Sequence, residues 1–78
     1  MTKQAGGMRD HAPIVVHPVS ATGGRRVTVR GQILGLAYDD LDLVEFLRRA
    51  GVDEPEAILD DPTWVEWRGG MPHDWGDT

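Results

Sequence analysis

The sequence has no cysteine among its 78 residues, which excludes disulfide bonds, thiolate metal ligands and thiol chemistry. A chain without cysteines suits a reducing compartment, so we expect a cytoplasmic location. No apolar run approaches the roughly 20 residues of a membrane-spanning helix. The first residues also lack the apolar stretch of a signal peptide. We therefore expect neither membrane insertion nor export.

Sequence signatures of catalysis are also absent. Ser20 is the only serine, and no glycine-flanked nucleophile elbow surrounds it. The paired glycines lack both the strand–loop–helix context and the lysine of a phosphate-binding loop. His11, His17 and His73 do not have the spacing of zinc ligands. We expect no enzymatic activity, no cofactor and no metal site.

A chain of this length allows one domain with a modest core. Residues 1–12 show no apolar periodicity, so we interpret them as a flexible N-terminal tail followed by a single domain over 13–70. Gly69 and Gly70 then predict a loose C-terminal tail over 71–78, unless Trp75 is pinned to the body of the domain. Arginine outnumbers lysine seven to one, which is compatible with a high-GC bacterial genome.

The first half of the domain has the pattern of β-strands. Residues 14–19 are rich in β-branched side chains, and Pro18 within them predicts an edge strand, because proline cannot donate to a ladder. The glycine-containing segment 20–24 predicts a hairpin turn. From residue 26 onward, alternation places Val27 and Val29 on the face that meets the core.

The apolar phase of this second strand becomes ambiguous after Gly31. Leu34, Leu36 and Tyr38 fall on the face opposite to Val27 and Val29. A bulge or bend at Gly31 or Gly35 would turn the three side chains inward, beneath the helices. A straight strand would leave them on an apolar open face, where a binding partner would be needed.

The second half begins with helical patterns. Asp39 or Asp40 is placed to cap a helix over residues 40–50, which carries an apolar stripe at helical spacing. Asp53 and Glu56 match the reciprocal capping arrangement of a second, shorter helix that stops before Pro62.

The segment 63–68 has strand-forming side chains and places Val65 and Trp67 on the core face. A helical turn that starts at Asp61 and Pro62 is the competing interpretation of this segment. The resulting prediction is an α+β fold with the element order β-β-α-α-β. In it, an N-terminal hairpin and a C-terminal strand form a three-stranded antiparallel sheet, which two helices cover on one face.

Charge and aromatic side chains suggest where a partner would bind. Residues 1–38 carry five basic side chains and one acid, whereas residues 39–78 carry twelve acids and three arginines. In the predicted fold, Arg25, Arg26 and Arg30 form a basic strip on the open sheet face. Trp64 and Trp75 lie on the same face, and exposed aromatics beside arginines are typical anchors of protein interfaces.

These features favour a small, non-catalytic protein-interaction or regulatory module that binds another protein or a second copy of itself through the open sheet face. The alternative is a weak single-stranded nucleic-acid-binding module that uses arginines and aromatics on the sheet. The net charge of −5 disfavours this alternative, because it repels phosphate. The residues predicted to contact the partner are Arg26, Arg30, Tyr38, Trp64 and Trp75.

Overall fold

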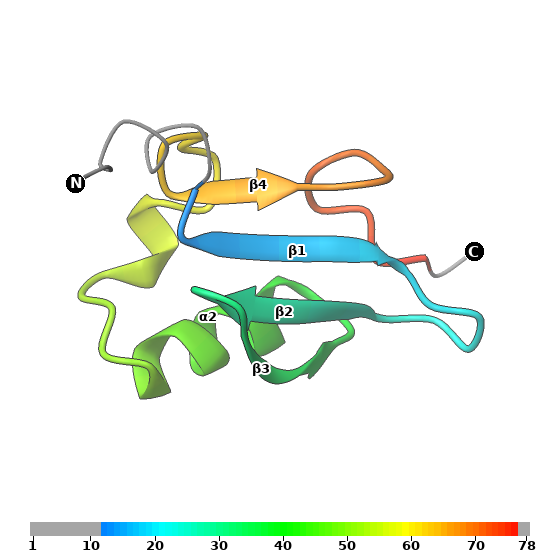
Figure 1. Cartoon of the computed structure of the whole chain (residues 1–78), viewed down its shortest axis with the longest axis horizontal. Helices are drawn as coiled ribbons and strands as arrows, with labels where there is room; N and C mark the ends of the chain where they lie inside the picture. The colour runs from blue at the N-terminus through cyan, green and yellow to red at the C-terminus, as the bar shows by residue number, and fades with distance from the viewer. Residues whose placement is uncertain (1–11, 77–78) are drawn as a thin grey trace, which may run out of the picture.

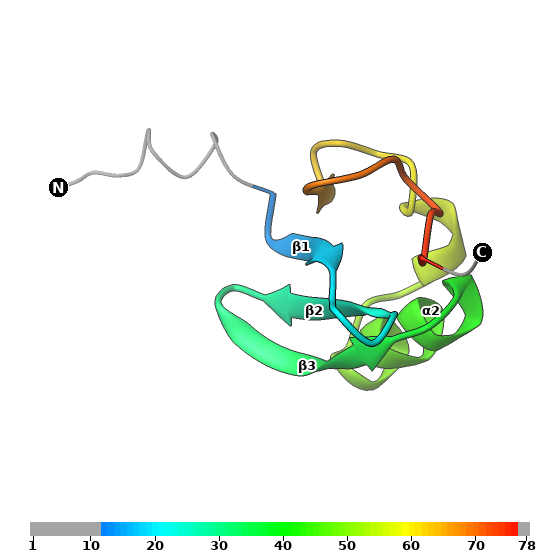
Figure 2. The same cartoon turned by 90° about the vertical axis from the view of Figure 1, so that its right-hand side faces the viewer.

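The computed structural model describes residues 12–76 and has an α+β fold, which confirms the predicted class. A four-stranded mixed sheet with the strand order β3-β2-β1-β4 packs against one α-helix (Figure 1). In Figure 2 the helix α2 lies to one side of the strands. The elements are β1 (Ile14–Val19), β2 (Arg25–Val29), β3 (Gln32–Ala37), α2 (Asp40–Arg49), the single 3-10 turn η1 (Pro55–Ala57) and β4 (Val65–Trp67).

Two successive hairpins build the first three strands. The predicted turn at residues 20–24 is confirmed, and the Ser20 hydroxyl closes it by donating to the Gly23 carbonyl at 2.6 Å. The prediction of one long bent strand after residue 25 is wrong. Arg30 and Gly31 have φ angles of 52° and 85°, and this pair of left-handed residues reverses the chain into β3 as a separate strand.

The expected bulge does occur, but further along than Gly31. Gly35 pairs with Val27 and Ile33 pairs with Thr28, which leaves Leu34 as the extra residue in β3. Leu34 consequently packs against the core, as the bent-strand alternative predicted.

The same bulge turns Ile33 outward, where its side chain is 67% exposed. Leu36 pairs with Arg26 on the open face, and Tyr38 is 54% exposed. The prediction that a bulge would bury Leu34, Leu36 and Tyr38 together is therefore right for Leu34 alone. A single bulge shifts only the residues on one side of it.

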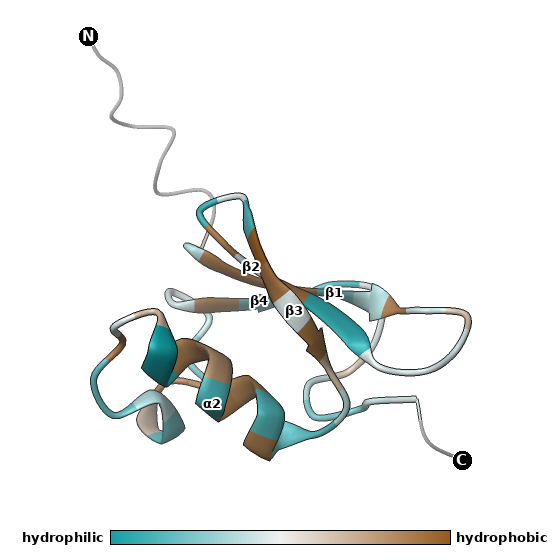
Figure 3. Cartoon of the chain, turned by 90° about the horizontal axis from the view of Figure 1, so that it is seen from below, coloured by the Kyte–Doolittle hydropathy of each residue, from teal (hydrophilic) through white to brown (hydrophobic). Residues whose placement is uncertain are grey.

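The helix α2 confirms the predicted helix over residues 40–50. The Asp39 carboxylate caps it by accepting from the Asp42 amide at 2.8 Å. Leu43, Val44 and Leu47 are buried on the face toward the sheet. Figure 3 shows α2 as alternating brown and teal segments, as expected for a helix with one apolar and one polar face.

The second predicted helix is wrong, because only η1 forms there. Glu54 adopts a left-handed backbone with φ 51°, which separates Asp53 from the turn, and no side chain caps it. Pro55 follows directly and Pro62 lies seven residues later. The segment between these breaks is too short to propagate a helix.

The prediction that residues 63–68 contain a strand is confirmed, but the strand pairs differently from the expected antiparallel arrangement. β4 lies parallel to β1, with Ile14 opposite Val65 and Val16 opposite Trp67. β1 is therefore an interior strand rather than an edge strand. Pro18 is accommodated because it follows the last residue paired with β4, at an irregularity in the β1–β2 register.

Two residues expected at the surface lie in the interior. Arg25 is 0% exposed, because alternation places it on the core face with Val27, so it does not belong to a basic strip on the open face. Trp75 is 7% exposed and donates its indole N–H to Asp40 at 2.8 Å. This contact pins residues 71–76 to the body, the exception that the sequence left open. Residues 1–11, with His11, and residues 77–78 lie outside the described range.

Candidate binding pocket

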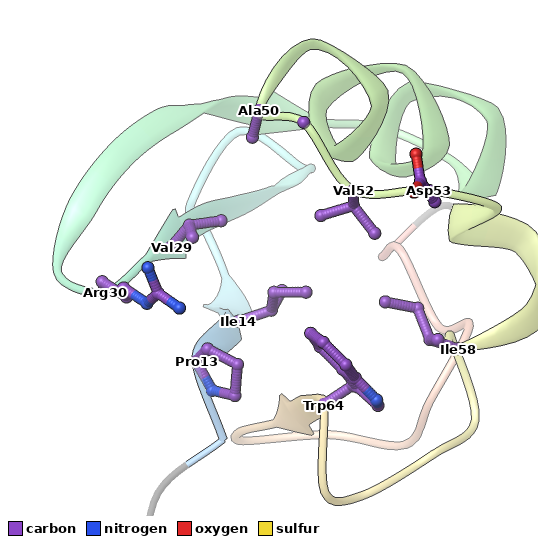
Figure 4. A pocket seen from close by; sticks show the side chains of 10 residues that line it. Pro13, Ile14, Val29, Arg30, Ala50, Val52, Asp53, Ile58 and Trp64 are labelled. Carbon is purple, nitrogen blue, oxygen red and sulfur yellow. The ribbon is translucent and has the colours of Figure 1, made fainter. Parts of the chain in front are cut away.

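A cavity lies at one end of the sheet, between the strands and the segment that follows the helix α2 (Figure 4). It has a volume of about 450 Å³, within the range of small ligand pockets. Trp64 forms one wall, and Arg30 lies at one edge of the same cavity. The pocket is lined by Pro13, Ile14, Val29, Arg30, Ala50, Gly51, Val52, Asp53, Ile58 and Trp64.

Backbone hydrogen bonds bring these distant segments together. The Arg30 amide donates to the Pro13 carbonyl at 2.7 Å, which holds the end of β2 beside the start of β1. The Ile14 amide donates to the Trp64 carbonyl at 3.1 Å, so the residue before β4 lies against the same point. The pocket therefore depends on the parallel pairing of β1 and β4.

A compact turn orients Trp64. The amide and hydroxyl of Thr63 donate to the Asp61 carboxylate at 3.0 Å and 2.7 Å. These hydrogen bonds, with the hydroxyl contribution the larger, hold the pKa of Asp61 below its usual value. The Trp64 amide in turn donates to the Asp61 carbonyl at 2.9 Å. Because Trp64 precedes β4, its side chain joins the pocket instead of the open sheet face where it was predicted.

The lining of the pocket is mainly apolar and carries charged side chains at its edges. Ile14 is 1% exposed and contributes core surface to the floor. Trp64 is 44% exposed, so much of its ring is available to a ligand. Arg30 and Asp53 are the charged residues of the lining. Such a surface can accept an apolar group and contact charges beside it.

The five residues predicted to bind a partner are thus separated. Arg30 and Trp64 share the pocket, whereas Arg26 lies with Ile33 and Leu36 along a second hollow on the open sheet face. Tyr38 is exposed between β3 and α2. Trp75 is buried in the core.

A cluster of polar side chains around His73 fastens the C-terminal segment. Nδ1 of His73 lies 2.7 Å from Asp40, and Nε2 lies 2.6 Å from Asp60. The hydrogen bond to Asp60 is the main cause that raises the pKa of His73, with Asp40 adding to it and partial burial opposing it. With a carboxylate at each ring nitrogen, the imidazole bridges Asp40 and Asp60.

The pKa of His17 is shifted in the opposite direction, downward. Its Nε2 lies 3.0 Å from the Thr28 hydroxyl on the open sheet face. Partial burial is the main cause that lowers the pKa of His17, and the nearby cations Arg26 and Arg68 lower it further. Within residues 12–76, no group of three or more histidine or acidic side chains is arranged to hold a metal ion.

Sequence reasoning missed most of the pocket. Val29 was predicted as core, and Asp53 as a helix cap, but neither was expected near Trp64. Ile58 had been given to the second helix. These residues meet through pairing between distant segments, for which a single sequence carries no local signal.

Comparison with known proteins adds no relatives. No family model matches the sequence, and neither the curated proteins nor the solved structures include a significant match. In the described part of the chain, no helix combines the length and hydrophobicity required to cross a bilayer.

Proposed function

We propose that this protein is a non-catalytic interaction module that binds another polypeptide at the pocket formed around Trp64. The observation that carries the proposal is the half-exposed Trp64 ring on the wall of a pocket floored by core side chains, with Arg30 at its edge. Tryptophan and arginine are the residues most enriched among the energetic hot spots of protein interfaces.

The nucleic-acid alternative has less support. It needs aromatic side chains beside arginines on the open sheet face, and Trp64 and Trp75 lie elsewhere. The net charge of −5 also opposes binding to a polyanion.

Site-specific photo-crosslinking tests the proposal. The photoreactive residue p-benzoylphenylalanine is placed at position 64 and, as a control, at the exposed position 33 on the open sheet face. In a lysate of the source organism, position 64 should capture a discrete protein that position 33 does not. The captured protein is then purified and its Kd for the wild-type chain is measured.

Substitutions decide whether the purified partner uses the pocket. Trp64→Ala should weaken binding at least about tenfold, as expected for a hot-spot tryptophan. Arg30→Ala should weaken it less, while Tyr38→Ala and Arg26→Ala should leave it within about twofold. An affinity that survives Trp64→Ala in a folded variant would reject the pocket as the binding site.

A further inference from the structure

The two sides of the pocket carry opposite charges. Arg30 lies at one edge beside Val29, and Asp53 lies across the cavity beside Val52 (Figure 4). Both charged side chains are exposed. Neither one makes a hydrogen bond or ion pair through its side chain within residues 12–76.

Two other surface arginines form ion pairs with acidic side chains. Arg48 pairs with Glu56 at 2.8 Å, and Arg68 pairs with Glu66 at 2.8 Å. Arg30 and Asp53 are thus available to a ligand, whereas Arg48 and Arg68 are engaged by neighbouring acids. The pocket offers a ligand one cation and one anion, separated by an apolar surface.

The backbone at Arg30 supports a role for its side chain. Arg30 has φ 52°, at the first central position of the two-residue turn that joins β2 to β3. Asn, Asp and Gly are strongly preferred in such a turn, because other residues are strained in the left-handed region. A strained residue that places its side chain at a cavity is a reason to look for function there.

We infer that the pocket binds a peptide segment in which one apolar side chain lies between an acidic residue and a basic residue. This inference rests on the proposed function and specifies the partner's chemistry. The apolar side chain packs on Trp64 and on the partly exposed Val29 and Ile58. The acidic group faces Arg30 and the basic group faces Asp53, so the charges fix the direction in which the peptide lies.

Charge complementarity favours this occupant over others. A nucleic acid would meet Arg30 but would be repelled by Asp53 and by the net charge of −5. A fatty acid could fill the apolar pocket and pair its carboxylate with Arg30, but it would leave Asp53 without a partner. Only a ligand with both charges matches both edges.

The test uses nine blocked peptides of the form Ac-Xaa-Ala-Leu-Ala-Xaa-NH2, in which each Xaa is Glu, Lys or Ser. Dissociation constants are measured by NMR titration of the wild-type chain, followed at the indole N–H of Trp64. One of the two mixed-charge peptides should bind roughly threefold to tenfold more tightly than the Ser-flanked peptide, because each exposed ion pair adds a modest factor. The peptides with two like charges should gain nothing.

A charge-exchanged variant provides the decisive comparison. Arg30→Glu combined with Asp53→Lys keeps the net charge and should reverse the preference between the Glu-first and Lys-first peptides. The control variant, Arg26→Glu combined with Glu45→Lys, exchanges charges outside the pocket and should keep the wild-type order. Equal binding of all charge patterns, or no reversal in the exchanged variant, would overturn the inference.

The same experiments separate this inference from the proposed function. If a purified partner binds through Trp64 but no peptide preference exists, the interaction module stands and the mixed-charge ligand is rejected. If Trp64→Ala leaves the affinity for that partner unchanged, the pocket itself is rejected. Fatty acid or oligonucleotide binding that displaces the preferred peptide would also reject the mixed-charge ligand.

Discussion

Arg25 shows how a single buried charge organises this small domain. Its guanidinium donates to the carbonyls of His17, Arg68, Met71 and Asp74 at 2.7 to 3.0 Å. The Trp67 ring lies 5.4 Å from its central carbon. Burial lowers the pKa of Arg25, and the Asp74 charge opposes this effect. The side chain thereby ties the C-terminal segment to β1 and β2.

We expect Arg25→Lys to lower the free energy of unfolding by about 3 kcal/mol, because one ammonium cannot reach carbonyls arranged around a planar guanidinium. Urea unfolding followed by circular dichroism measures the change. Arg26→Lys is the matched control, since Arg26 is the exposed neighbour on the same strand and should change stability by less than about 0.5 kcal/mol. Equal effects of the two substitutions would contradict the role assigned to Arg25.

In the strained turn between β2 and β3, two substitutions should change the free energy of unfolding in opposite directions. Arg30→Asn should raise the free energy of unfolding by about 0.5 to 1 kcal/mol, because asparagine tolerates the left-handed backbone better. Gly31→Ala should lower it by about 1 kcal/mol, since Gly31 has φ 85° and a Cβ there would meet no neighbour within 4 Å. Urea unfolding of both variants checks the signs. If Arg30→Asn is not stabilising, the argument from strain at Arg30 loses its basis.

At the scale of elements, local patterns predicted the structures that local interactions form. The capping carboxylate at Asp39 and the apolar stripe over α2 are such patterns, as is the turn at residues 20–24. The second hairpin was missed because its turn begins with an arginine instead of the usual asparagine or aspartate. A second helix was predicted where only η1 forms, because a capping pattern in the sequence does not reveal the left-handed backbone at Glu54.

The contacts of His73, which attach the C-terminal segment, predict that the free energy of unfolding depends on pH. The pKa of His73 is raised in the folded protein by Asp60 and Asp40, so the folded state binds this proton more tightly than the unfolded chain does. This stabilisation is complete below the unfolded value of about 6.5 and is lost as the pH rises through the higher folded value. Its size is below about 1 kcal/mol, because the His73 side chain is 37% exposed and therefore screened.

Urea unfolding between about pH 5 and pH 9 measures this dependence. His73→Gln should remove the loss of stability at the alkaline end. His17→Gln is the control with the opposite sign, because the pKa of His17 is lowered and its protonation penalises the folded state only at the acidic end. An alkaline limb that persists in His73→Gln would show that another group carries it.

For the whole molecule, the order of the strands was the main feature that could not be predicted from the sequence. The parallel contact of β1 with β4 joins segments about fifty residues apart, and nothing in Val65 or Trp67 indicates which strand edge they will choose. The candidate site could not be predicted for the same reason. Trp64 and Arg30 were both selected from their chemistry, but only the β1–β4 pairing explains why they share one pocket.

We expect the chain to be monomeric, and the placement of its exposed apolar side chains is the first reason. Within residues 12–76, the exposed large apolar side chains lie at several places: Val19 and Ile33 on the sheet, Tyr38 and Leu41 near the start of α2, Trp64 at the pocket and Met71 in the C-terminal segment. Stable homodimers usually need one contiguous apolar patch. A net charge of −5 adds repulsion between copies.

We therefore expect a single species of about 8.6 kDa in sedimentation equilibrium at micromolar concentrations and physiological salt, with no dependence of mass on concentration. The measurement is repeated at high salt, where repulsion between the acidic chains is screened and weak association would emerge. The control variants are Trp64→Ala, which removes the pocket wall, and Ile33→Lys, which removes the most exposed apolar side chain of the sheet. A dimer that Trp64→Ala abolishes would identify the chain itself as the polypeptide bound at the pocket. A dimer lost only in Ile33→Lys would instead place self-association on the open sheet face, independently of the pocket.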